Sequence, residues 1–541
     1  MKRKYSASIL FAVTVLLFSN VSFCQINFEW SKRNDVRLFN RQPNIPKPNS
    51  ILVDSSGNTY FTSLIIDSNK VKVLLVKYNS TGSLKWSRTY LTNVDGVNGN
   101  YGSIVKSDGR NSIYIASRYL DSTTNKILLL KYDSTGNMIW DRRYLNPGSS
   151  CDVTGGMDLD KSGFIYVTGY SQDFNTFIKC LTLKYNSNGD LQWARSFQPN
   201  STGTDIVVDE QGNSYIAGTI LVGNSSKTYM MAAKYDGSGV LLWTKSYGID
   251  NGGYDEATNV ILDDSSNVIV GGYSYYQDWN YTVLKYSNSG TLIKYTNYNQ
   301  GGYDIVSSLA TDSRGNIYVT GRSDYSTILI KYDCMLAYRG AVIPTDYSIN
   351  KVKYAGGKYI YITGSKKYTS PTRTGLYFAK LDTNLSTVYS IDFPMDSALN
   401  LVPYSFVIDK NGNILIGAGA EYVPVSPPLN NYYYSFVFKL SPVSGIQNIT
   451  GNVADKYSLE QNYPNPFNNT SNLKFEIVKS GDVKIVVYDV QGREVQTLVN
   501  ERLNAGTYLV KFDGSMLTSG VYFYKMVTGE FSETKRMILI K

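Results

Sequence analysis

The sequence predicts an all-β protein, and three features of its 541 residues point to this fold class. Tyrosine is abundant, with 47 residues against 20 phenylalanines and 6 tryptophans, and a ring that carries a hydroxyl suits half-buried strands. The 45 glycines, against 15 prolines, provide for many tight turns. A pattern of four short apolar runs recurs along the chain, with no helical periodicity between its copies.

Each copy of the repeat has the same internal order. The first run ends at the aspartate of an Asp-x-x-Gly-Asn turn, which allows positive φ and folds the chain back as a hairpin. The second run follows at once, the third ends in Lys-Tyr, and the fourth carries tryptophan. The clearest turn aspartates are Asp54, Asp160, Asp209, Asp312 and Asp409, and the tryptophans are Trp86, Trp140, Trp193 and Trp243.

Four short antiparallel strands per unit, repeated without helical crossovers, predict a β-propeller over residues 25–445. We expect eight blades, with seven as the alternative if one degenerate copy is only a loop. The last copy lacks a tryptophan run, and Phe28-Glu-Trp30 near the N-terminus supplies one. The N-terminal strand is therefore expected to complete the last blade, whereas an open array of hairpins would leave two sheet edges unprotected.

These copies resemble the bacterial β-propeller repeat family, whose units carry an Asp-x-x-Gly-Asn-x-Tyr core. The resemblance implies the fold and says almost nothing about a ligand or an activity.

Residues 1–24 have the pattern of a secretory signal peptide. Lys2, Arg3 and Lys4 precede a mostly apolar run that is too short to span a membrane with polar flanks. We expect cleavage after Cys24. The alternative is lipidation of Cys24, which the large Phe23 beside it disfavours.

The remaining composition excludes several classes of function. The chain has no histidine, which excludes Ser-His-Asp and Cys-His catalysis and histidine-ligated metal sites. The net charge of +9 is spread without a basic block, so we expect no nucleic-acid partner. Cys151, Cys180 and Cys334 lie far apart and are expected to be buried single thiols. No later stretch has the length and hydrophobicity of a membrane span.

The C-terminal part of the chain changes character. Residues 446–456 are polar and turn-rich, which predicts a linker, and residues 457–541 contain alternating runs that predict a small Ig-like β-sandwich. This segment resembles the type A C-terminal sorting domain of the Bacteroidetes type IX secretion system. The matching stretches are 462–467, 488–495, 503–508, 519–522 and the basic, apolar tail 534–541.

The resemblance implies export across the outer membrane by the type IX secretion machinery, after a signal peptide has delivered the chain to the periplasm. In that family the domain is usually removed, and the product is released or attached at the cell surface. The alternative is a C-terminal adhesion or carbohydrate-binding sandwich.

Acidic residues ahead of the first run are the candidate binding site. Asp152, Asp255 and Asp304 each lie eight residues before a turn aspartate, and Asp205 is a shifted equivalent. These carboxylates are expected to ring one mouth of the central channel and bind a polar ligand or a cation such as calcium. The alternative is that each one accepts hydrogen bonds from local backbone. No catalytic residue, metal site or other cofactor is assigned.

The expected function is a non-enzymatic binding or adhesion module, secreted or displayed at the cell surface, with a glycan or protein ligand. The alternatives are an extracellular hydrolase or lyase that uses paired carboxylates on polysaccharide, and a structural surface component. Clustered facing acids with shifted pKa values would favour an enzyme, and an exposed aromatic patch would favour a binding protein. The periodic aromatics are expected to be core residues.

Overall fold

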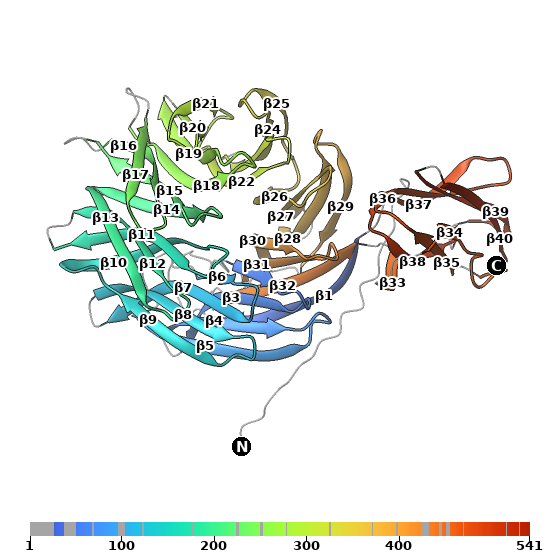
Figure 1. Cartoon of the computed structure of the whole chain (residues 1–541), viewed down its shortest axis with the longest axis horizontal. Coiled ribbons are helices and arrows are strands. Elements are labelled where there is room, and N and C mark those ends of the chain that lie inside the picture. Colours follow the sequence, from blue (N-terminus) through green and yellow to red (C-terminus); the bar gives the residue numbers. More distant parts are fainter. Residues whose placement is uncertain are drawn as a thin grey trace, which may run out of the picture. The chain divides into compact units, whose positions relative to one another are not determined.

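A computed structural model (Figure 1) shows that the chain is built from β-strands. No helix occurs in the part of the chain that it describes, which confirms the predicted all-β class. The predicted signal peptide, residues 1–24, lies outside the described residues. Those residues are 26–36, 50–67, 70–95, 103–121, 124–174, 177–222, 227–248, 253–276, 278–323, 326–369, 372–395, 399–422, 432–442, 446–450, 455–468, 470–514, 517–529 and 531–541.

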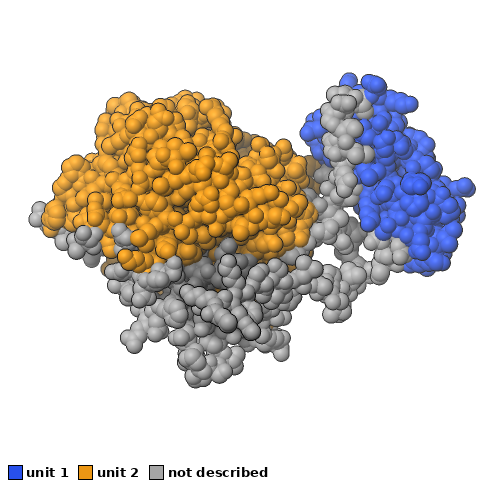
Figure 2. Space-filling model, turned by 90° about the horizontal axis from the view of Figure 1, so that it is seen from below, with its two compact units in different colours: residues 1–25, 443–541 blue, residues 26–442 orange. Residues whose placement is uncertain are grey.

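Two compact units, coloured separately in Figure 2, divide the chain between Pro442 and Val443. The larger unit, Ile26–Pro442, consists of sets of four antiparallel strands, two of which join into one eight-stranded sheet through a single parallel pair, Cys151 with Asn125. In chain order the sets are β2–β5 (Ser50–Val53, Thr59–Asp67, Lys70–Tyr78, Leu84–Asp95), β6–β9 (Ile104–Ser107, Ser112–Asp121, Thr124–Asp133, Met138–Tyr144), β10–β13 (Ser149–Leu159, Ile165–Asp173, Ile178–Tyr185, Leu191–Pro199), β14–β17 (Ser201–Val208, Ser214–Leu221, Thr228–Tyr235, Leu241–Tyr247), β18–β21 (Glu256–Leu262, Val268–Tyr276, Asp278–Tyr286, Leu292–Tyr298), β22–β25 (Ile305–Thr311, Ile317–Arg322, Thr327–Tyr332, Tyr338–Val342), β26–β29 (Lys351–Tyr354, Tyr359–Thr369, Thr372–Asp382, Thr387–Phe393) and β30–β32 with β1 (Leu399–Ile408, Ile414–Tyr422, Tyr432–Pro442, Ile26–Val36).

Successive sets pack face to face in the manner of propeller blades. The first strand of each set contacts the first strand of the next, from β2 and β6 through to β26 and β30, and β30 contacts β2. Apolar clusters fill the space between neighbouring sets; one of them joins Ile51 and Phe61 to Leu415 and Val437. The N-terminal strand β1 pairs antiparallel with β32.

The periodic tryptophans are packing residues, and each one reaches the following set. The indole of Trp193 lies against Gly239, which has a φ of +83°, and its Nε1 donates to the Gly237 carbonyl over 3.2 Å. Only a residue without Cβ leaves room for the ring while adopting this φ at little cost. Trp30, Trp86, Trp140 and Trp243 repeat the arrangement against Gly82, Gly136, Gly189 and Gly290.

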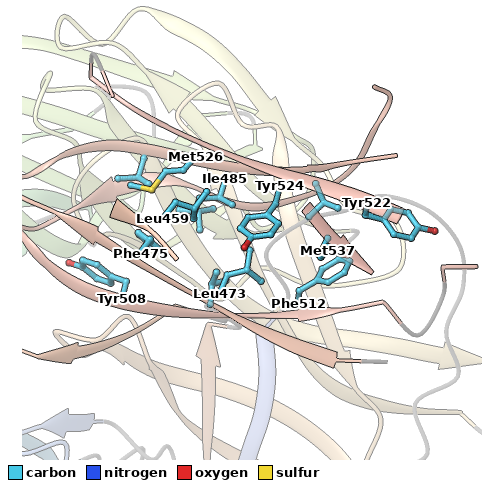
Figure 3. Packing of buried hydrophobic residues seen from close by; sticks show 14 of the residues in the cluster. Leu459, Leu473, Phe475, Ile485, Tyr508, Phe512, Tyr522, Tyr524, Met526 and Met537 are labelled. Carbon is cyan, nitrogen blue, oxygen red and sulfur yellow. The ribbon is translucent and has the colours of Figure 1, made fainter. Parts of the chain in front are cut away.

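The smaller unit contains two four-stranded sheets. One has the order β33-β38-β35-β34 and the other β37-β36-β39-β40. Aromatic and aliphatic side chains from both sheets, among them Phe475, Phe512 and Tyr524, form its core (Figure 3). The strands are β33 (Ile446–Thr450), β34 (Ser458–Leu459), β35 (Thr470–Ile477), β36 (Gly481–Tyr488), β37 (Glu494–Leu503), β38 (Gly506–Asp513), β39 (Gly520–Thr528) and β40 (Phe531–Leu539).

The boundary between the units differs from the predicted linker, residues 446–456. Its first five residues form β33, which pairs with β38. The physical reason is that β38 offers a free edge in its sheet, and backbone pairing satisfies amides that a polar linker would leave to water.

The three cysteines beyond the N-terminal segment are free, but their burial differs from the prediction. Cys180 is buried, Cys151 is half-buried, and Cys334 is exposed because it lies in the turn between β24 and β25. No helix among the described residues has the length and hydrophobicity to cross a membrane.

Candidate functional site

Three of the four candidate aspartates are almost completely buried: Asp152, Asp255 and Asp304 are each at most 1% exposed. Each accepts a hydrogen bond from nearby backbone. The donors are the amide of Asn146 to Asp152, the amide of Tyr275 to Asp255 over 3.0 Å, and the amide of Gln300 to Asp304 over 2.6 Å. Carboxylates in this setting fix the loops ahead of β10, β18 and β22.

Asp205 has a different environment, in which it links two neighbouring sets. Its Oδ1 accepts from the Ile206 amide and its Oδ2 from the Val260 amide of β18, each over 3.0 Å. Asp205 keeps some accessible surface, yet protein encloses it, and this burial raises its pKa to about 6. Its carboxylate therefore helps to hold β14 against β18.

Burial also raises the pKa of the other two aspartates for which a shift is resolved. The pKa of Asp304 is raised to about 6, with the negative charge of Asp278 adding to the effect and the Gln300 amide opposing it. The pKa of Asp152 is raised by burial and opposed by the Asn146 amide. Within the described ranges, no three His, Cys, Asp or Glu side chains come close enough together to hold a metal ion.

Charged side chains on the first strands of three sets are a second candidate site, one that the sequence did not predict. Lys106 of β6 pairs with Asp158 of β10 over 2.8 Å, and Asp158 also accepts from the Val208 amide over 3.0 Å. Lys353 of β26 is exposed to solvent, although many protein atoms surround it. Desolvation lowers its pKa to about 8, and Lys106 and Lys351 add to this. Lys106, Asp158 and Lys353 are each the second-to-last residue of the first strand of their set, and this position is apolar in the other sets. A charged residue at this position is the sequence signal that could have found them.

An exposed group of aromatic rings lies where the set β18–β21 meets the start of β22. Trp279 pairs directly with Tyr275 across the β19–β20 hairpin, and their ring centroids are 5.3 Å apart. Tyr254 and Tyr303 each precede a first strand, and their rings lie 6.4 and 5.3 Å from Trp279 at interplanar angles of 23° and 32°. Tyr273 contacts the same indole edge-on at 4.9 Å. We call these five residues the aromatic patch.

The patch remains open to solvent. Tyr254, Tyr275 and Tyr303 are 49%, 36% and 53% exposed, although each ring packs against Trp279. Exposed aromatic surface of this kind marks interaction sites on proteins. The sequence signal for it is the segment Gly-Gly-Tyr-Asp, which occurs at 252–255 and again at 301–304 and places each tyrosine beside a candidate aspartate.

Six of the other exposed apolar side chains are features of the repeat. They stand at one equivalent position, the start of the outermost strand, in six successive sets: Leu84, Met138, Leu191, Leu241, Leu292 and Tyr338. A side chain that recurs in six sets is explained by the repeat, whereas no other set has a tryptophan at the position of Trp279, six residues before the lysine of the Lys-Tyr pair.

In the smaller unit, the segment 462–467 is bonded to the last strand. The Asn465 Oδ1 accepts from the Ile538 amide over 2.9 Å, and the Phe467 amide donates to the Ile538 carbonyl over 2.9 Å. Tyr524 accepts from the Asn462 amide and donates to the Glu460 carbonyl, each over 2.8 Å. Tyr463 is 80% exposed. The motif residues thus tie the C-terminal strand into the sandwich.

Comparison with protein families supports both parts of the chain. Residues 461–541 match the family described as "Secretion system C-terminal sorting domain", and residues 293–325 match "Beta-propeller repeat". Both resemblances drawn from the sequence are therefore confirmed. No curated protein matches the chain.

Three solved structures show a distant similarity to the chain. A puromycin hydrolase has 11% identity and a TM-score of 0.40, covering 73% of this chain, which spans only 62% of that enzyme. The polysaccharide lyase Uly1 has 10% identity and a TM-score of 0.40, with 76% of this chain and 99% of that chain covered. The β-propeller domain of the Trilobed protease from Pyrococcus furiosus has 9% identity and a TM-score of 0.37, with 62% and 96% covered. Values this low assign no reaction or ligand.

Fold and family matches together define a class: a β-propeller protein that carries a secretion-system C-terminal sorting domain. The sorting domain supports a secreted or cell-surface protein.

Proposed function

We propose that this chain is a non-enzymatic binding or adhesion protein, exported by the type IX secretion machinery to the cell surface or medium, which contacts its extracellular ligand through the aromatic patch. The observation that carries the proposal is the exposure of Tyr254, Tyr275 and Tyr303 around Trp279. Rings that already support one another lose little conformational freedom when a ligand covers them, which favours binding.

The candidate aspartates have positioning roles in this proposal. Asp255 holds the Tyr275 backbone, and Asp304 holds the loop from which Tyr303 projects. Their carboxylates are buried and bonded to backbone, so they fix the segments that carry the patch. Glycosidic cleavage needs a pair of solvent-facing carboxylates, and buried carboxylates do not supply one.

A binding screen of the purified protein against extracellular glycans and surface proteins tests the proposal. Wild type is compared with Trp279→Ala and with Phe174→Ala, which removes an exposed ring outside the patch. We expect ligand binding that Trp279→Ala weakens and Phe174→Ala leaves unchanged. Binding that is indifferent to both substitutions would refute the proposed contact surface. The screen is run with and without calcium, because cation binding by Asp152, Asp205, Asp255 and Asp304 stays a prediction.

A further inference from the structure

The polar surroundings of the patch suggest what kind of ligand it takes. Asp278 accepts from the Trp279 amide over 2.9 Å and from the Gly302 amide over 3.2 Å. The exposed Asn299, with Gln300 beside it, belongs to the loop that leads to Tyr303, and each tyrosine brings a hydroxyl. Ring faces are thus bordered by groups that donate and accept hydrogen bonds. A pyranose ring has the matching chemistry, with an apolar C–H face and a rim of hydroxyls.

Charge narrows the ligand class. The ionised side chains that hydrogen-bond to residues of the patch are acidic. Asp278 accepts from the Trp279 amide, and Glu256 is hydrogen-bonded to Tyr273, whose pKa is raised by burial and by this carboxylate. Negative charge beside the rings repels sulfated or uronate-rich chains. It does not affect uncharged sugars, whose hydroxyls can donate to carboxylates.

The size and composition of the patch disfavour a protein as the occupant. A specific protein interface covers about 20–30 residues a side, with a desolvated apolar centre. Tyr254, Tyr275, Trp279 and Tyr303 belong to none of the aliphatic clusters that fill the space between the sets. Four rings with a polar border match one or two sugar units better than a broad apolar centre.

We infer that the aromatic patch binds a neutral glycan by stacking sugar rings on Tyr254, Tyr275 and Tyr303 around Trp279. This inference rests on the proposed function and names its ligand class. The tyrosines supply the stacking faces, Trp279 holds them in a fixed arrangement, and Asp278 and the loop 299–302 provide hydrogen-bonding partners for hydroxyls.

The test is affinity electrophoresis and calorimetry of the purified protein with laminarin, mannan and starch as neutral polysaccharides and with alginate and heparin as anionic ones. We expect at least one neutral polysaccharide to bind, and the Tyr303→Ala substitution to weaken that binding by about tenfold or more. Phe174→Ala is the matched control and should leave the dissociation constant unchanged. Tyr303 lies in the loop two residues before β22 and is half exposed, so its loss is expected to leave the melting temperature unchanged.

The outcomes separate the two proposals. Binding confined to alginate or heparin, or neutral-glycan binding that survives Tyr303→Ala, overturns the glycan inference. A protein ligand whose binding needs Trp279, together with no binding of any neutral polysaccharide, overturns the glycan inference and keeps the proposed function. Absence of any patch-dependent ligand overturns both.

Discussion

The Oδ1 atom of Asp255 accepts a hydrogen bond from the backbone amide of Tyr275 over 3.0 Å, and the side chain of Tyr275 packs against Trp279. A buried carboxylate next to β18 thereby sets the position of an exposed ring in the neighbouring strand. Asp255, which the sequence predicts as a site residue, and the ring of Tyr275, which it does not, therefore belong to one local structure.

Replacing Asp255 tests this coupling. Asp255→Ala leaves the partly buried Tyr275 amide without its acceptor, and we expect the free energy of unfolding to fall by about 1–3 kcal/mol. Asp255→Asn keeps an acceptor oxygen and is the matched control, with a smaller loss. Urea denaturation measures both. Equal losses for the two variants would mean that the hydrogen bond to Tyr275 does not account for the role of Asp255.

The raised pKa of Asp304 predicts that the free energy of unfolding falls as the pH rises through about 6. Burial raises its pKa to about 6, so the folded state binds its proton more tightly than the unfolded chain does. The contribution of Asp304 to stability is therefore full below about pH 4 and is lost as the pH rises to about 6, by up to about 3 kcal/mol. Asp304→Asn keeps an acceptor for the Gln300 amide and lacks this loss.

Denaturation of wild type and Asp304→Asn at several pH values between 4 and 7 checks the prediction. The stability of the variant relative to wild type should increase across this interval and level off above it. A relative stability that stays constant, or decreases with pH, would contradict a raised pKa for Asp304.

The contact between Trp193 and Gly239 can be separated from backbone strain. A Cβ added to Gly239 would lie 2.8 Å from the Trp193 Cδ2 atom, whereas a Cβ at Gly163, with a similar φ of +86°, meets nothing within 4 Å. We expect Gly163→Ala to cost about 1–2 kcal/mol from strain alone. Gly239→Ala should cost more, by about 1–3 kcal/mol, because the indole must move. Thermal and urea unfolding of both variants measure the difference, and equal costs would show that the tryptophan contact is unimportant.

The hydroxyl of Tyr524 is expected to stabilise the sorting domain. Its hydroxyl joins the Asn462 amide to the Glu460 carbonyl, and Tyr524→Phe leaves both without this partner, at an expected cost of about 2 kcal/mol. Hydrogen exchange of residues 460–472 in the full chain should become faster. Tyr463→Phe changes an exposed hydroxyl and should leave the exchange unaltered. Unchanged exchange in Tyr524→Phe would contradict this role for the hydroxyl.

Repetition explains how much of the fold could be predicted from the sequence. The turn aspartates, the Lys-Tyr pairs and the tryptophans recur because each set of strands must pack on the next in the same way. The segment Phe28-Glu-Trp30 could therefore be recognised as the missing tryptophan strand, and it forms part of β1. The boundary after the propeller could not be predicted in the same way. Residues 446–450 have the composition of a linker, and they form β33 only because they pair with β38.

The candidate site was predictable only in part. The eight-residue spacing located Asp152, Asp255 and Asp304, but spacing does not reveal whether a carboxylate faces solvent or backbone. Trp279 cannot be recognised from the repeat, because no other set has a tryptophan at that position. Its contacts with Tyr254 and Tyr303 join segments that are far apart in sequence and meet only after the sheets have formed.

The most direct test of the central claim is a hydrogen-exchange footprint of the purified protein with and without a ligand found in the binding screen. The account predicts slower exchange at residues 253–256, 273–276, 278–280 and 299–304, and loss of that protection in Trp279→Ala. Protection that falls on other parts of the propeller, with these segments unchanged, would contradict the assignment of the aromatic patch as the binding surface.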